Sequence, residues 1–184
     1  MRTSAIRALK PNVTQEEAVR FFRSGVFSAA YWRIRSGPLQ RIATAYVPFW
    51  VYQVRYEIGR ARKTRLFALD AVRGTLDLFE FPRVPPDNEL VTIETRNQLL
   101  PRLQPDAAEE LLRMKVLRVL FQQGFFKLRA LKVDIEEIPG ELHLPYWLAF
   151  YGSDETAKCR VMDAVRRRIE GSKARSFFEE WLAA

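Results

Sequence analysis

The longest hydrophobic pattern in the chain lies between Leu39 and Ile58, where β-branched and aromatic residues predominate. Such residues are typical of β-strands, and the pattern predicts one long strand or two strands joined by an irregularity. Pro48 lies inside this stretch and has no N–H to donate to a neighbouring strand. We therefore expect Pro48 at a sheet edge, a bulge or a strand start. Because successive side chains point to opposite faces, Trp50 shares a face with Pro48, and Val47 lies on the other face.

Three segments show the apolar spacing of amphipathic helices. The first begins at Thr14, whose hydroxyl forms a capping-box pattern with the carboxylate of Glu17, and it ends between residues 24 and 30. The second is predicted over residues 107–123, with Asp106 as its cap. The third is predicted over residues 172–182, close to the end of the chain.

One motif occurs twice: a proline, an aromatic residue, a tryptophan and an aliphatic residue, followed later by Asp-Ala-Val-Arg. Pro48 and Asp70 belong to the first copy, and Pro145 and Asp163 belong to the second. The two prolines are 97 positions apart (145 minus 48) and the two aspartates are 93 apart (163 minus 70), as expected when copies differ in loop length. The repeated order of helix cap, Pro-aromatic-Trp and Asp-Ala-Val-Arg predicts an internal duplication.

The Asp-Ala-Val-Arg segments are predicted to be tight connections between strands. The carboxylates of Asp70 and Asp163 are expected to accept hydrogen bonds from backbone amides of the turn, and Gly74 accepts the positive φ that closes it. This turn-capping role competes with an alternative in which the two aspartates form a matched acid–base pair. The second copy has Arg167 where the first has Gly74, so the two turns are not chemically equivalent.

These elements predict an α+β fold with two tandem repeats, each a helix packed on an antiparallel sheet of about four strands, plus a C-terminal helix. Residues 1–85 form the first repeat, residues 93–184 the second, and the proline-rich residues 82–92 the linker. Association of the repeats into one compact pseudo-symmetric body is the alternative to two separate units. Residues 161–169 can be drawn as a helix, but the duplication predicts a strand, a turn and a strand. The other strands are predicted at residues 29–35, 66–69, 75–79, 125–135, 142–151 and 157–162.

A helix opened by Thr-x-Glu-Glu-Ala and followed by Tyr-x-Pro-Phe-Trp resembles a module of uncharacterised bacterial and archaeal proteins, often attached to zinc ribbons or membrane segments. The order of a helix followed by a meander, with an Asp-x-x-x-Gly turn between the last strands, is also similar to the PepSY and cystatin-like α+β folds. This chain lacks the zinc-ribbon cysteines and any apolar run of membrane-spanning length. The resemblance implies a fold and brings no catalytic residues.

Composition narrows the chemistry that we expect. The chain has one cysteine, Cys159, and one histidine, His143, which leaves no intrachain disulfide and too few ligands for a structural zinc site, so we expect no metal and no cofactor. We find no run of about 18 apolar residues and no secretory signal, and we expect a cytoplasmic protein with no membrane span. The net charge is +8, and residues 1–92 hold 15 basic and 8 acidic residues, against 15 and 14 in the remainder.

Several side chains are candidates for binding. One basic group occupies a predicted hairpin tip and comprises Arg60, Arg62, Lys63 and Arg65. A second group follows Asp163 and comprises Arg166, Arg167 and Arg168. Both groups are compatible with phosphate binding or with a solvated surface. Trp50 and Trp147 are candidates for ligand stacking or for packing between helix and sheet.

The leading hypothesis is a non-enzymatic binding or protein-interaction module for a protein partner or a small ligand, because a repeated architecture occurs without a catalytic constellation. Binding of nucleic acid or another polyanion through the basic first half is the alternative. A weaker alternative is a small enzyme in which His143 acts with a carboxylate. The closing helix, with Phe177, Phe178 and Trp181, either docks on a partner or covers its own sheet.

Overall fold

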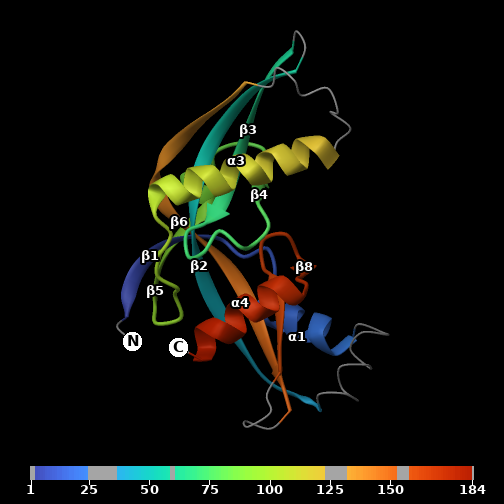
Figure 1. The fold of residues 1–184 in the computed structure, drawn as a ribbon. Helices are drawn as coiled ribbons and strands as arrows, with labels where there is room; N and C mark the ends of the chain where they lie inside the picture. The colour runs from blue at the N-terminus through green and yellow to red at the C-terminus, as the bar shows by residue number, and fades with distance from the viewer. Residues whose placement is uncertain (1–2, 25–36, 59–60, 123–131, 153–157, 184) are drawn as a thin grey trace.

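The computed structural model describes residues 3–24, 37–58, 61–122, 132–152 and 158–183. These residues form a single curled, mixed sheet of eight strands with three α-helices (Figure 1). The predicted pair of tandem units, each with its own sheet of about four strands, is therefore wrong. The predicted strands do form, but the longest strand of each half pairs with that of the other half, so one sheet passes through both.

Two long antiparallel strands, β2 (Leu39–Ile58) and β6 (Val133–Tyr151), form the middle of the sheet. Beyond β2 the sheet continues through β3 (Ala61–Asp70) and β4 (Phe79–Phe81). Beyond β6 it continues through β7 (Lys158–Asp163) and β8 (Arg168–Ile169), and through β1 (Ser4–Leu9) and the edge strand β5 (Leu90–Thr95). The contact of β1 with β6 is parallel and is centred on Ala8 and His143.

The long strand predicted from Leu39 to Ile58 is confirmed, and it contains the expected irregularity as a register shift between Phe49 and Val51. The strand, turn and strand predicted for residues 161–169 are also confirmed. The strand predicted at residues 75–79 is instead β4, which begins at Phe79. Strands β1 and β5 were not predicted, and β5 lies partly within the predicted linker. The strand predicted at residues 29–35 and most of residues 125–135 lie outside the described residues.

Both prolines of the repeated motif lie at the point where a neighbouring strand leaves its ladder. Phe49 pairs with Asp70 at the end of β3, and the carbonyl of Pro48 then accepts a hydrogen bond from the Ala71 N–H at 2.8 Å. In a strand, the N–H and the carbonyl of one residue point to the same side. An N–H at position 48 would therefore point towards the chain after β3 has ended, where the ladder needs no donor. Pro145 accepts from the Ala164 N–H at 3.1 Å in the same way.

The helices are α1 (Gln15–Ser24), α3 (Pro105–Gln122) and α4 (Ser172–Ala183), and a 3-10 turn, η1, spans Asp87–Glu89. Thr14 and Glu17 form the reciprocal hydrogen bonds of a capping box at the start of α1, at 2.8 and 3.2 Å. Helix α3 begins at Pro105, which places Asp106 inside the first turn instead of at the cap. Among the described residues, no helix is both long and apolar enough to cross a lipid bilayer.

Helices α1 and α3 each pack on strands of the other half as well as on the long strand of their own half. Phe22 of α1 belongs to a buried cluster with Trp147 and Tyr151 of β6, whereas Leu112 of α3 packs in a cluster with Tyr52 of β2 and other residues of β2 and β3. The segment that precedes each of these helices is also hydrogen-bonded to the other half. Asn12 N–H donates to the Ala164 carbonyl at 2.8 Å, and Arg102 N–H donates to the Ala71 carbonyl at 2.9 Å. The halves are thus intertwined.

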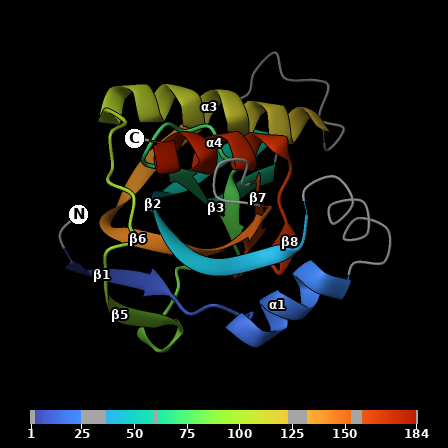
Figure 2. The same ribbon diagram turned by 90° about the horizontal axis from the view of Figure 1, so that it is seen from below.

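The third helix, α4, lies inside the curl of the long strands, whereas α1 lies outside it (Figure 2). On this inner face, Val47 and Phe49 of β2 and Tyr146 of β6 join Phe177 and Phe178 of α4 in the largest hydrophobic cluster. Phe177 and Phe178 of α4 thus cover their own sheet, as one of the sequence interpretations predicted.

The two aspartates of the motif each organise a turn. Asp70 is completely buried, and its carboxylate accepts hydrogen bonds from the backbone N–H groups of Arg73, Gly74 and Leu76 at 2.8 to 2.9 Å. Asp163 is equally buried and accepts from two backbone N–H groups, those of Val165 and Arg166, at 2.8 Å. Each carboxylate is thus occupied within its own turn, which favours the turn-capping role over a matched acid–base pair.

Residue 74 and residue 167 have the same left-handed backbone conformation. Gly74 has a φ of 65° and Arg167 a φ of 56°, each four residues after its aspartate. Arg167 is the non-glycine residue with positive φ in the described part of the chain. The aspartate hydrogen bonds therefore hold the second turn in this conformation without the glycine that makes it easy in the first.

The single sheet makes each half depend on the other for folding. After cleavage at a protease site inserted between Arg83 and Val84, we expect the two fragments to remain associated, because the β2 and β6 ladder and the exchanged helices persist. Size-exclusion chromatography of the cleaved protein measures this association. Each fragment expressed alone should show no cooperative thermal unfolding. Two fragments that elute separately and are both folded would contradict this interdependence.

We expect Asp70→Ala and Asp163→Ala each to lower the free energy of unfolding by about 2 to 4 kcal/mol, since each buried N–H left without an acceptor costs about 1 to 3 kcal/mol. Asp87→Ala is the control, because that carboxylate is 93% exposed and its ion pair with Arg7 contributes about 1 kcal/mol or less. Urea denaturation followed by circular dichroism measures all three. Equal costs for Asp70→Ala and Asp87→Ala would disprove the capping role.

Candidate functional site

A cavity of about 370 Å³ opens where α4 meets the turn after β3 and the connection between β5 and α3. Its volume lies in the range of about 300 to 1,000 Å³ that is typical of small-molecule sites. The turn contributes Val72 and Arg73, and α4 contributes Phe177, Glu180 and Trp181. The rest of the lining comes from β1 and the connection: Ser4, Arg96, Gln98, Leu99, Leu100 and Arg102.

Backbone hydrogen bonds hold the connection in place. The Tyr46 N–H of β2 donates to the Asn97 carbonyl at 2.8 Å, and the Leu99 N–H donates to the Tyr46 carbonyl at 2.9 Å. A few residues later Arg102 N–H donates to Ala71 at the turn. The Gln98 side-chain amide also donates to the Ser4 hydroxyl. The walls are thus fixed by hydrogen bonds to other elements of the fold.

The floor of the cavity is apolar. Val72, Leu99 and Phe177 are almost completely buried and belong to the central hydrophobic cluster. Trp181 is half-buried and makes an edge-to-face contact with Phe178, with ring centroids 6.3 Å apart. An aromatic side chain held in this way offers a rigid surface on which an apolar ligand can pack.

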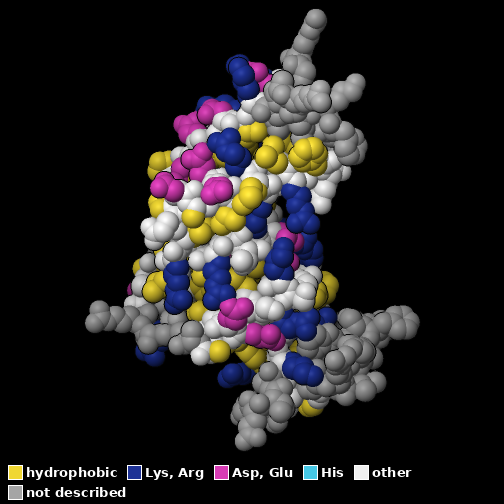
Figure 3. All heavy atoms as spheres, viewed as in Figure 1, with side chains coloured by type: hydrophobic (Ala, Val, Ile, Leu, Met, Phe, Trp, Pro, Cys, Tyr) yellow, Lys and Arg dark blue, Asp and Glu magenta, His cyan; other side chains and the backbone are white. Residues whose placement is uncertain are grey.

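The rim of the cavity is mainly cationic, with three arginines and one glutamate. Arg73 forms an ion pair with Glu180. Arg96 donates from Nε to the Thr3 hydroxyl at 3.0 Å. Arg102 is exposed and, within the ranges that the structure describes, its guanidinium has no ion pair. The face that carries α4 shows basic, acidic and hydrophobic side chains next to one another (Figure 3).

The predicted basic groups lie elsewhere and are largely paired with carboxylates. Arg62 and Arg65 belong to β3, where Arg62 pairs with Glu57 at 2.8 Å and Arg65 with Glu80 at 3.4 Å. Lys63 lies between them and is exposed, and Arg60 lies outside the described residues. These ion pairs reduce the positive charge that the hairpin offers to a polyanion.

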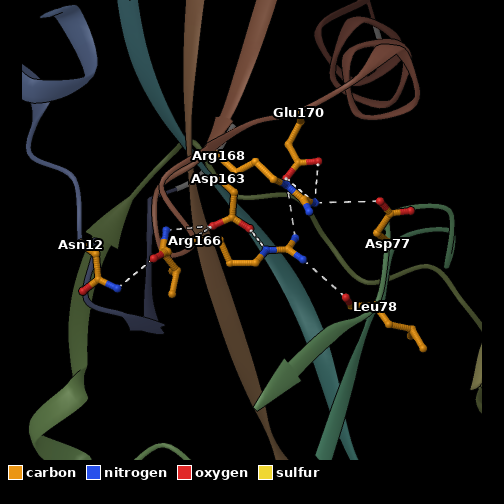
Figure 4. A network of polar contacts seen from close by, with 8 residues as sticks. Asn12, Asp77, Leu78, Asp163, Arg166, Arg168 and Glu170 are labelled. Atoms are coloured by element: carbon orange, nitrogen blue, oxygen red, sulfur yellow. Dashed lines mark hydrogen bonds and ion pairs between the residues drawn. The ribbon is translucent and has the colours of Figure 1, made fainter. Parts of the chain in front are cut away.

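The second basic group is part of a polar network around Asp163 (Figure 4). Arg166 donates from Nε to the Asp163 carboxylate at 2.6 Å, and its guanidinium lies 4.7 Å from the centroid of the Phe79 ring. Arg168 pairs with Glu170 at 3.0 Å. Arg167 is exposed and forms the left-handed turn position. The network connects the turn after β7 to Phe79 of β4 and to Asp77 and Leu78 before it. Its role is structural.

The two tryptophans of the motif, candidates for ligand stacking, both pack between a helix and the sheet. Trp147 is buried against α1 and donates from Nε1 to the Val13 carbonyl at 2.9 Å. Trp50 is half-buried against the cluster under α3. Each therefore packs a helix onto the sheet, the alternative that the sequence also allowed.

His143 is 97% buried at the junction of β1 and β6, with Nε2 3.5 Å from the Glu141 carboxylate. Its Nδ1 has no hydrogen-bond partner among the described residues. Burial lowers the pKa of His143, and the Glu141 carboxylate opposes this only in part. His143 is therefore neutral near pH 7, and it is not among the residues that line the cavity. Cys159 is also buried, and desolvation raises the pKa of its thiol to about 12, so it is not an activated nucleophile.

The sequence interpretation missed the cavity. Trp181 and Phe177 were recognised as apolar positions of the last helix, but Arg73, Arg96 and Arg102 were not singled out. The arginines are isolated in sequence and come together only through the hydrogen bonds of the connection. In the described part of the chain, no three His, Cys, Asp or Glu side chains lie close enough to hold a metal ion.

Comparisons with known protein families, curated proteins and solved structures find no match for this chain. The resemblance to the PepSY and cystatin-like families, and to the module with Tyr-x-Pro-Phe-Trp, thus stays a prediction. The candidate site rests on its own geometry.

The buried His143 should make stability depend on pH. Above its ordinary pKa of 6.5 the side chain is neutral in both the folded and unfolded states. Below that pH the unfolded chain takes up a proton that the folded protein does not bind until its lowered pKa is reached. We therefore expect the free energy of unfolding to decrease as the pH is lowered from 6.5 towards the pKa of the folded protein, by up to about 1.4 kcal/mol per pH unit.

Urea denaturation at several pH values between about 7.5 and 5 compares the protein with His143→Gln, which removes the only histidine. The carboxylates titrate in both proteins, so the difference between the two curves isolates His143. Parallel curves would show that His143 has the same proton affinity in the folded and unfolded states.

Proposed function

We propose that the protein is a non-enzymatic binding module that holds a small ligand in the cavity beside α4. The observation that carries this proposal is a preformed cavity with an apolar floor and a few polar groups at its rim, the combination that characterises small-molecule sites. Trp181, Phe177 and Leu99 supply the surface on which the ligand packs. The fixed connection between β5 and α3 keeps that surface open.

The two alternative functions have less support in the geometry. Binding of a polyanion would draw on the basic hairpin of β3, where Arg62 and Arg65 already have carboxylate partners. Catalysis by His143 would need access to a substrate, and this side chain is 97% buried. Both alternatives keep their direct tests, which are retention on mixed nucleic acids at low salt and loss of any detected turnover in His143→Ala.

Screening of a panel of small apolar and amphipathic molecules by thermal shift tests the proposal. For a ligand found in this way, we expect Trp181→Ala to raise Kd by about tenfold or more, which corresponds to the loss of roughly 1.4 kcal/mol of packing. Isothermal titration calorimetry measures Kd for the protein and its variants.

Trp50→Ala is the matched control, because Trp50 is also a half-buried tryptophan but packs under α3, outside the cavity lining. We expect this variant to lose stability and to keep its affinity for the ligand. An equal loss of affinity in both variants would place the ligand elsewhere, and a panel without any ligand would refute the proposed function.

A further inference from the structure

The cavity beside α4 has an unequal distribution of charge between its floor and its rim. Val72, Leu99 and Phe177 form the apolar floor, whereas the charged lining residues are three arginines and Glu180. The rim therefore has a net charge of +2, since three positive charges face one negative charge. A ligand with an apolar body that reaches the floor must place its other end among these guanidinium groups.

The three arginines differ in how much of their hydrogen-bonding capacity is already used. Arg73 is neutralised by Glu180 on the neighbouring helix. Arg96 uses Nε on the Thr3 hydroxyl, and its Nη groups have no ion pair with a described residue. Arg102 has neither an ion pair nor a side-chain hydrogen bond among the described residues. Two guanidinium groups at the mouth of an apolar cavity thus lack an anionic partner.

A guanidinium group presents parallel N–H donors that match the two oxygens of a carboxylate. The attraction is stronger beside an apolar surface than in open water, because fewer water molecules screen the charges. A cationic ligand would be repelled by the net charge of the rim. A neutral ligand would gain only the contacts of the floor.

Resting on the proposed function, we propose that the ligand of this cavity is an anionic amphiphile, an apolar chain or ring that carries one carboxylate. Its apolar body packs on Trp181, Phe177 and Leu99, and its carboxylate accepts hydrogen bonds from Arg102 and Arg96 at the rim. The cavity volume of about 370 Å³ suits a small ligand of this class and not a long lipid.

Three probes with the same eight-carbon chain separate the charge from the apolar body: octanoate, 1-octanol and octylammonium. By calorimetry at low ionic strength, we expect octanoate to bind about tenfold more tightly than octanol, and octylammonium to bind most weakly. The affinity for octanoate should fall as salt is added, because salt screens the exposed rim charges, whereas the affinity for octanol should not fall.

Arg102→Gln and Arg96→Gln identify the groups that hold the carboxylate. We expect the double variant to bind octanoate with the affinity of octanol and to leave the affinity for octanol unchanged. Arg118→Gln is the matched control, since Arg118 is an exposed arginine on α3 that does not line the cavity. This control should keep the preference for octanoate.

The outcomes separate this inference from the proposed function. Equal affinity for octanoate and octanol, or a preference for octanoate that survives in the double variant, would overturn the anionic class and leave small-molecule binding in place. Failure of all three probes would also overturn the inference, and the wider panel then decides the function: a neutral ligand sensitive to Trp181→Ala would preserve it. If no molecule of the whole panel binds, both the inferred ligand class and the proposed function are contradicted.

Discussion

The positions of both halves follow from the ladder in which β2 pairs with β6, from Leu39 with Tyr151 to Tyr56 with Val133. Strand pairing satisfies the backbone groups of two long strands at once, and neither strand can leave it without exposing those groups. Because the strands run antiparallel, each half projects its hairpin towards the opposite end of the molecule. The helix of each half then lies over the hairpin of the other, which explains why the segments before α1 and α3 are bonded to Ala164 and Ala71.

The cavity is a consequence of this exchange. The chain must pass from the edge strand β5 to α3, and on the way it is bonded to Tyr46 in the middle of the sheet and to Ala71 at a turn. This path leaves a hollow between the connection and α4, which lies inside the curl of the sheet. The turn beside the hollow is itself held by the buried carboxylate of Asp70, so the shape of the site depends on these hydrogen bonds.

The distribution of charge in the structure favours a compact ligand over an extended polyanion. Arg62 and Arg65 of β3 and Arg166 of the turn after β7 have carboxylate or aromatic partners, and these partners fix strands and turns. The arginines at the cavity are different, because Arg102 and Arg96 lie beside an apolar floor and keep donors that no described carboxylate uses. A basic sequence thus contains cations that fix strands and turns and cations that line a cavity, and only their surroundings distinguish them.

Local sequence determined the elements and several of their details. The period of the side chains predicted the strand from Leu39 to Ile58 and the helix after Gly171, and the short-range chemistry of Thr14 with Glu17 and of Asp70 with its turn needs only neighbouring residues. Which strands pair was not predictable in this way, because the apolar pattern of a strand does not specify its partner, and the paired residues of β2 and β6 lie about a hundred positions apart. Tertiary structure alone therefore decided that one sheet replaces two, that the helices are exchanged, and that Arg96, Arg102 and Trp181 surround one cavity.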